Sequence, residues 1–196
     1  MKRKILFVAI VLAVAMVCLV ACGGNAASLQ QIQSLLKADY SQIILNVSTT
    51  TSDVTLNGNY TLTFDGNKTN VVYDFYRLNG LDVNGDNADS YLSREQGSVV
   101  VEDGVIVEGD KSVELPQEVN FNGISFKQAF FTNVTTSGAK FEADVTNPQG
   151  FTGNNSLVCS NMHVKVMYSQ TALSAIAITY VSEGGSDVSI TYSFVK

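Results

Sequence analysis

The sequence has no tryptophan, which argues against a flat aromatic platform for carbohydrate, although eight tyrosines remain. It also lacks the Gly-x-Ser-x-Gly motif of serine hydrolases, the His-Glu-x-x-His motif of zinc proteases and a phosphate-binding glycine loop. No two acidic residues have a spacing that indicates carboxylates converging on one bond, as a glycosidase requires. We therefore expect a binding protein rather than an enzyme, and no cofactor.

Basic residues are few, with 12 Lys and Arg against 18 Asp and Glu and a net charge of −6. A nucleic-acid-binding surface needs a basic face to neutralise phosphates, so this balance argues against nucleic acid as a partner. The same balance argues against electrostatic adhesion to anionic lipid.

Cysteine is scarce as well, with only Cys18, Cys22 and Cys159 in the chain. Cys18 and Cys22 belong to an apolar N-terminal run, so the rest of the chain has one cysteine and no internal disulfide. The only histidine, His163, follows Cys159 by four residues in a predicted strand. An even separation predicts that both side chains share one face, about 13 Å apart. We therefore expect Cys159 to be a small buried apolar residue and not a nucleophile.

The first 21 residues have the layout of a secretory signal, with a basic start and an apolar run from Ile5 to Ala21. The run ends in Leu19-Val20-Ala21-Cys22, which resembles the bacterial lipobox, whose cysteine receives a diacylglyceryl group and becomes the new N-terminus. An uncleaved membrane anchor is the alternative, because residues 5–22 are nearly long enough to span a bilayer. We favour lipidation of Cys22, since small residues surround the cut and no aromatic belt or charged stop follows it.

Cleavage before Cys22 removes three basic residues and no acidic one, which leaves a net charge of −9. Two acyl chains give stable membrane anchoring, so the expected location is the extracytoplasmic face of a bacterial membrane, at the cell surface or in the periplasm. The chain then divides into a signal peptide (1–21), an anchor and spacer (22–27) and a single β-rich domain (28–196).

The spacing of apolar residues predicts one helix followed by many strands. Leu29, Ile32, Leu35, Leu36 and Tyr40 recur at helical spacing, with Ser28 as the expected N-cap. From Gln42 onward the period is two, and an Asp103-Gly104 turn predicts one clear hairpin. The expected strands cover residues 43–49, 54–64, 71–75, 98–102, 105–108, 129–135, 139–145, 158–168, 173–181 and 188–194, with a loop at 147–153. The predicted fold is mainly β: a curled antiparallel sheet with an N-terminal amphipathic helix, or alternatively a β-sandwich.

The order of a helix and a β-meander resembles the LolA/LppX-like half-barrel lipoproteins. The runs that carry the resemblance are Leu56-Asn57-Gly58-Asn59-Tyr60-Thr61-Leu62 and Val72-Tyr73-Asp74-Phe75. The resemblance implies a sheet curled around the helix and an apolar concavity that holds acyl chains or lipids. The resemblance does not identify any individual residue of this chain as a binding residue.

Six aromatic residues are expected on the concave face of such a sheet: Tyr60, Phe64, Tyr73, Phe75, Phe130 and Phe141. They could line a pocket for a hydrophobic or amphiphilic ligand, or they could form a packed core beneath the helix. The alternative function is a surface interaction module that recognises a protein or a cell-wall glycan through exposed loops.

The polar composition of residues 78–96, which are rich in Asp, Asn and Ser, predicts a long loop. Asp82, Asn84 and Asp86 occupy the first, third and fifth ligand positions of an EF-hand calcium loop. The pattern then fails, because Asn87 stands where glycine is needed and Ser93 replaces the bidentate glutamate. Two interpretations remain, an irregular Ca²⁺ site and a solvated turn rich in Asp and Asn, and we favour the turn.

Overall fold

The computed structural model describes residues 25–79 and 91–196 and confirms a mainly β protein with one open antiparallel sheet of ten strands. The strand order is β5-β4-β3-β2-β1-β10-β9-β8-β7-β6. The described strands all belong to this sheet, so the architecture is a curled half-barrel and not a β-sandwich. The lipobox cysteine Cys22 and the calcium candidates Asp82, Asn84 and Asp86 lie outside the described residues.

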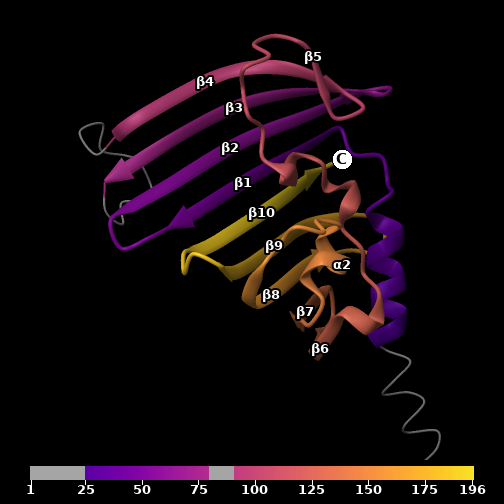
Figure 1. Ribbon diagram of the computed structural model, residues 1–196. Coiled ribbons are helices and arrows are strands. Elements are labelled where there is room, and N and C mark those ends of the chain that lie inside the picture. The colour runs from indigo at the N-terminus through magenta and orange to yellow at the C-terminus, as the bar shows by residue number, and fades with distance from the viewer. Residues whose placement is uncertain (1–24, 80–90) are drawn as a thin grey trace, which may run out of the picture.

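Two meanders of five strands meet at the centre of the sheet, where β1 pairs with β10 (Figure 1). The first contains β1 (Gln42–Thr50), β2 (Val54–Asp65), β3 (Lys68–Asn79), β4 (Tyr91–Glu102) and β5 (Val105–Glu108). The second contains β6 (Phe131–Ser137), β7 (Lys140–Val145), β8 (Cys159–Tyr168), β9 (Leu173–Ser182) and β10 (Asp187–Val195).

Alternating apolar residues bury one face along most of the sheet, as the period of two predicts, and the paired residues Thr55 and Leu78 are also buried on the opposite face. Leu45 on β1 is fully buried and lies between Tyr60 on β2 and Tyr192 on β10. We call the face that contains these three side chains the inner face and the opposite one the outer face. Register is strongly specified here, because a shift by one residue would move Leu45 to the outer face.

The N-terminal helix covers residues 25–35 and lies beside the β6–β9 half of the sheet (Figure 1). Its apolar side is buried, including Leu29 and Ile32. The hydroxyl of Tyr40 donates to the carbonyl of Leu35 and accepts from the backbone N–H of Leu173, both at 2.9 Å, which ties the end of the helix to β9. The expected N-cap was wrong, because Ser28 lies within the helix, which also includes part of the expected spacer.

A segment that the sequence pattern did not predict crosses the inner face between the two ends of the sheet. This crossing segment, residues 109–130, connects β5 to β6 and contains three 3-10 turns (Figure 1). The turns are η2 (Gln117–Val119), η3 (Phe121–Gly123) and η4 (Gln128–Phe130). The hydroxyl of Tyr192 donates to the carbonyl of Glu118 at 3.0 Å, and the N–H of Phe126 donates to Oε1 of Gln33 at 2.6 Å. These bonds attach the crossing segment to β10 and to the N-terminal helix.

A short helix, α2 (Pro148–Thr152), occupies the region predicted as a loop. Its start and end follow ordinary capping rules: Asn147 Oδ1 accepts from the N–H of Gly150, and Gly153 ends the helix at φ 72°. Phe151 of α2 packs with Phe126 of the crossing segment, with ring centroids 5.4 Å apart. The helix therefore helps to close the core at the β6–β8 end.

The predicted loop at 78–96 was too long. β3 continues to Asn79 and β4 begins at Tyr91, so Ser93 is a strand residue that pairs with Arg77. The Asp103-Gly104 hairpin is confirmed, since both residues have the positive φ that a type I′ turn needs, 51° and 79°. In the part of the chain that the structure describes, no helix has the length and apolar character needed to cross a membrane.

Candidate ligand-binding cavities

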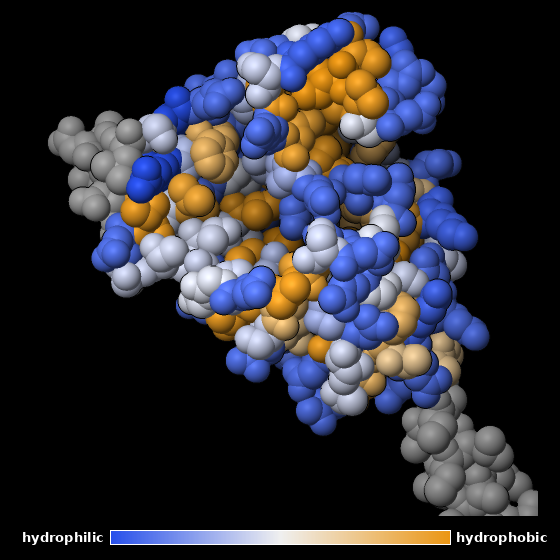
Figure 2. All heavy atoms as spheres, viewed as in Figure 1, coloured by the Kyte–Doolittle hydropathy of each residue, from blue (hydrophilic) through white to orange (hydrophobic). Residues whose placement is uncertain are grey.

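Two cavities lie between the inner face of the sheet and the crossing segment. The central cavity, of about 520 Å³, is bounded by the crossing segment, the β4–β5 hairpin, β9, β10 and the end of α2 with the chain that follows it. The lateral cavity, of about 550 Å³, is bounded by β2, β3, β4 and residues 112–116. Val113, Leu115 and Pro116 line both cavities, so this short stretch separates them. Figure 2 shows apolar side chains around a recess on this side of the molecule, below β5.

Tyrosine rings and glycines together shape the lateral cavity. Tyr73 on β3 pairs with Gly97 on β4, and a Cβ at Gly97 would lie 2.5 Å from Tyr73 Oη. A Cβ at Gly58 would meet the ring of Tyr60 equally closely. The two glycines therefore let both rings lie against the sheet backbone, where they form an apolar surface.

The six aromatic candidates do not form one site. Tyr60, Tyr73 and Phe75 line the lateral cavity, and 38% of Phe75 is exposed although it lies on the inner face. Phe64 instead packs against Phe121 of the crossing segment, with centroids 6.1 Å apart.

The last two candidates lie at the other end of the sheet. Phe141 is fully buried beside Phe126 and Phe131 and belongs to the core. Phe130 is partly buried, and the ammonium of Lys127 lies 5.6 Å from its ring centroid. Neither residue lines the central or the lateral cavity.

The residues that line the central cavity were not among the predicted site residues. Four of them come from the inner face of β9 and β10: Ile178, Tyr180, Ile190 and Tyr192. The alternation of the β10 pair with serine and threonine was visible in the sequence and could have placed these two residues on the concave face, whereas the β9 pair has apolar as well as polar neighbours. The contribution of Glu118 was not visible, because it depends on the path of the crossing segment.

The tyrosine hydroxyls in the cavities are neutral over the physiological pH range. Burial, and then the charge of Glu118, raises the pKa of Tyr60 and of Tyr180 to about 12. Burial and the same carboxylate also raise the pKa of Tyr192. These phenols therefore offer hydrogen bonds and aromatic faces, but no negative charge of their own.

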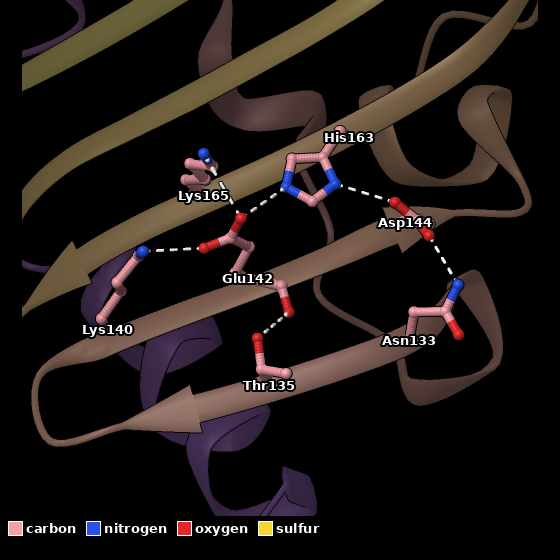
Figure 3. Close-up of polar contacts among 7 residues, drawn as sticks. All are labelled: Asn133, Thr135, Lys140, Glu142, Asp144, His163 and Lys165. Atoms are coloured by element: carbon pink, nitrogen blue, oxygen red, sulfur yellow. Dashed lines mark hydrogen bonds and ion pairs between the residues drawn. The ribbon is translucent and has the colours of Figure 1, made fainter.

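A separate polar cluster lies on the outer face of β7 and β8 (Figure 3). The ring of His163 is between two carboxylates, with Nδ1 2.8 Å from Asp144 Oδ1 and Nε2 3.1 Å from Glu142 Oε1. Lys140 and Lys165 also contact Glu142, at 2.7 and 3.3 Å. Hydrogen bonds from Lys140 and then His163 lower the pKa of Glu142 to about 2.

This cluster is an ion-pair network across β7 and β8. It is separate from both cavities, because none of its five residues lines either of them. The imidazole fills the space between the two carboxylates. Among residues 25–79 and 91–196, no group of His, Cys, Asp and Glu side chains is arranged to hold a metal ion.

Cys159 and His163 are on opposite faces, which corrects the prediction that they share one. Cys159 pairs with Ser182, whereas His163 pairs with Thr179, and the register shifts between them. The irregularity includes Asn161, whose φ is 55°. A β-bulge adds one residue to the strand and so reverses the alternation. Cys159 contacts the core, and burial raises the pKa of its thiol.

No protein family matches the sequence, and no curated protein is similar to it. Several solved structures share weak similarity with the chain, among them three dehydratases. The erythromycin dehydratase is 10% identical, with a TM-score of 0.18, over 80% of this chain and 73% of that one. The dehydratase domain from the terminal module of the rifamycin polyketide synthase is 11% identical, with a TM-score of 0.19, over 79% and 75%. An N-terminal dehydratase from the difficidin assembly line is 9% identical, with a TM-score of 0.18, over 86% and 84%.

Proposed function

We propose that this chain is a lipoprotein, anchored through Cys22 outside the cytoplasm, whose β domain binds a hydrophobic or amphiphilic ligand without catalysing a reaction. The observation that carries the proposal is the pair of cavities beneath the crossing segment, each of a size ordinary for small-molecule sites. The LolA/LppX-like resemblance, which implies an apolar concavity for acyl chains, favours the same function.

The lining of the cavities supports an apolar ligand. Ile178 and Ile190 face the central cavity, while Phe75 faces the lateral one. Some apolar surface remains exposed on the inside of the curled sheet. Covering it with a ligand is favourable by about 25 cal/mol per Å². Leu56, next to Phe75 across the β2–β3 pair on this face, is also 37% exposed.

The proposal is tested with a neutral photoreactive probe, an octanol that carries a diazirine, and the full-length chain in zwitterionic nanodiscs. We expect photolabelled peptides from the crossing segment and from β9 or β10. Val113 lines both cavities, so Val113→Trp should reduce this labelling severalfold by filling the space.

The matched control is Val72→Trp, because Val72 is 47% exposed and lies on the outer face of β3. It introduces the same side chain away from the cavities and should leave the labelling unchanged. Labelling that is confined to the outer face, or that survives Val113→Trp, would overturn the proposed function.

A further inference from the structure

In the described part of the chain, the charged groups that line the two cavities are all carboxylates. Glu118 lines the central cavity, and Glu95 and Glu114 line the lateral one. Among the residues that the structure describes, neither cavity is lined by a Lys, Arg or His. Glu118 is half-buried, so it attracts a cation, and repels an anion, more strongly than it would in bulk water, whereas Glu95 and Glu114 are exposed and more strongly screened. The charge of Glu118 therefore favours a cation over an anion in the central cavity.

Glu118 belongs to the lining of the central cavity. Its backbone carbonyl accepts the hydrogen bond from Tyr192, and its neighbours in the central cavity include Tyr180. Burial is the main reason that the phenol pKa values of Tyr60, Tyr180 and Tyr192 are raised, and the nearby charge of Glu118 is the second. The carboxylate is thus close enough to all three hydroxyls to act on them electrostatically.

Aromatic rings and a carboxylate together are suited to an ammonium group. A cation is attracted to the face of a tyrosine ring, and more so where water is excluded. The carboxylate adds a direct charge–charge attraction to the same group. A fatty acid or an anionic phospholipid would instead place a second negative charge beside Glu118.

We infer that these cavities take a cationic amphiphile, with its alkyl tail along the apolar inner face and its ammonium head group beside Glu118. This inference rests on the proposed function, because it assumes that the cavities hold an apolar tail. It adds the charge of the head group, which the apolar lining alone does not determine.

Three probes with the same tail test the inference: octyltrimethylammonium, n-octanol and octanoate. Each is titrated calorimetrically into the full-length chain in zwitterionic nanodiscs, with empty nanodiscs as the blank. At low salt we expect octyltrimethylammonium to bind at least about tenfold more tightly than octanoate, with octanol between them. The difference should shrink at high salt, because the head group interacts through charge.

Glu118→Gln should weaken binding of octyltrimethylammonium about tenfold and leave octanol unaffected. Glu183→Gln removes the same charge from the exposed β9–β10 turn and should change neither affinity. Equal binding of the three probes, or equal effects of Glu118→Gln and Glu183→Gln, would overturn the inferred preference for a cationic head group. The proposed binding of an apolar ligand would still stand. Failure of all three probes to bind would overturn both.

Discussion

The ring of Tyr73 on β3 occupies the space where a side chain at Gly97 on β4 would begin. A Cβ at Gly97 would lie 2.5 Å from Tyr73 Oη and 2.8 Å from Tyr73 Cζ. A substitution at Gly97 therefore forces either the Tyr73 ring or the β4 backbone to shift. Because Tyr73 lines the lateral cavity, the pair links the stability of the sheet to the shape of the site.

We expect Gly97→Ala to lower the free energy of unfolding by about 1–3 kcal/mol, the usual range for overpacking. The control is Gly184→Ala, since a Cβ at Gly184 would have no heavy atom closer than 4.0 Å; it should change stability by less than about 0.5 kcal/mol. Urea denaturation measures both. In a Tyr73→Ala background the cost of Gly97→Ala should largely disappear, and an unchanged cost would show that Tyr73 is not the cause.

The Glu142 network predicts a loss of stability in acid. The pKa of Glu142 falls from 4.5 to about 2 on folding, first through Lys140 and then through His163. A carboxyl group whose pKa is depressed on folding stabilises the native state above its unfolded pKa, and this contribution disappears as the pH falls through the folded value. The affected interval is therefore from about pH 4.5 down to about pH 2.

Glu142→Gln removes this titration, so the variant's urea midpoint should fall less steeply across that interval than the parent's. Glu183→Gln, at an exposed turn, controls for the loss of one carboxyl group and should follow the parent. Parallel curves for parent and Glu142→Gln would show that the network does not stabilise the fold.

Because the bulge at Asn161 puts Cys159 and His163 on opposite faces of the sheet, we expect the Cys159 thiol to react without help from the imidazole. Burial raises the pKa of Cys159, and the thiolate is the nucleophile, so iodoacetamide should modify Cys159 more slowly in the folded chain than in urea. His163→Ala should leave the folded rate unchanged, because the imidazole lies on the other face of the sheet. The rate is followed on the peptide that contains Cys159. A several-fold change in the variant would indicate a thiol–imidazole contact.

Most of the sheet could be predicted from local patterns. Ile43 and Leu45 alternate with residues of the outer face, and Asp103-Gly104 is a turn that few other residue pairs can make. Such signals lie within a few residues of one another, so they do not depend on the rest of the fold. The N-terminal helix followed from the same kind of local spacing.

The site was harder to predict because its parts meet only in three dimensions. Residues 109–130 have neither helical nor strand periodicity, and their position depends on hydrogen bonds from distant partners such as Gln33 and Tyr192. The contact of His163 with Asp144 depends on the β7–β8 register, in which these two residues pair. The bulge at Asn161, in the β8–β9 pairing, breaks the strict alternation of β8, so the face of His163 could not be read from its distance to Cys159. The aromatic candidates on β2 and β3 were placed correctly on one face, since that alternation is unbroken.

The membrane anchor gives the last prediction. If Cys22 is acylated, a clickable palmitate analogue should label the parent chain and the controls Cys18→Ala and Cys159→Ala, but not Cys22→Ala. Two acyl chains hold a protein at a bilayer, whereas a domain with a net charge of −9 gains no attraction from anionic lipid. Cys22→Ala should therefore also lose the tight membrane attachment that acylation gives the parent. Labelling of Cys22→Ala at the level of the parent would refute acylation at this residue, while the cavities and their proposed ligand would remain to be tested separately.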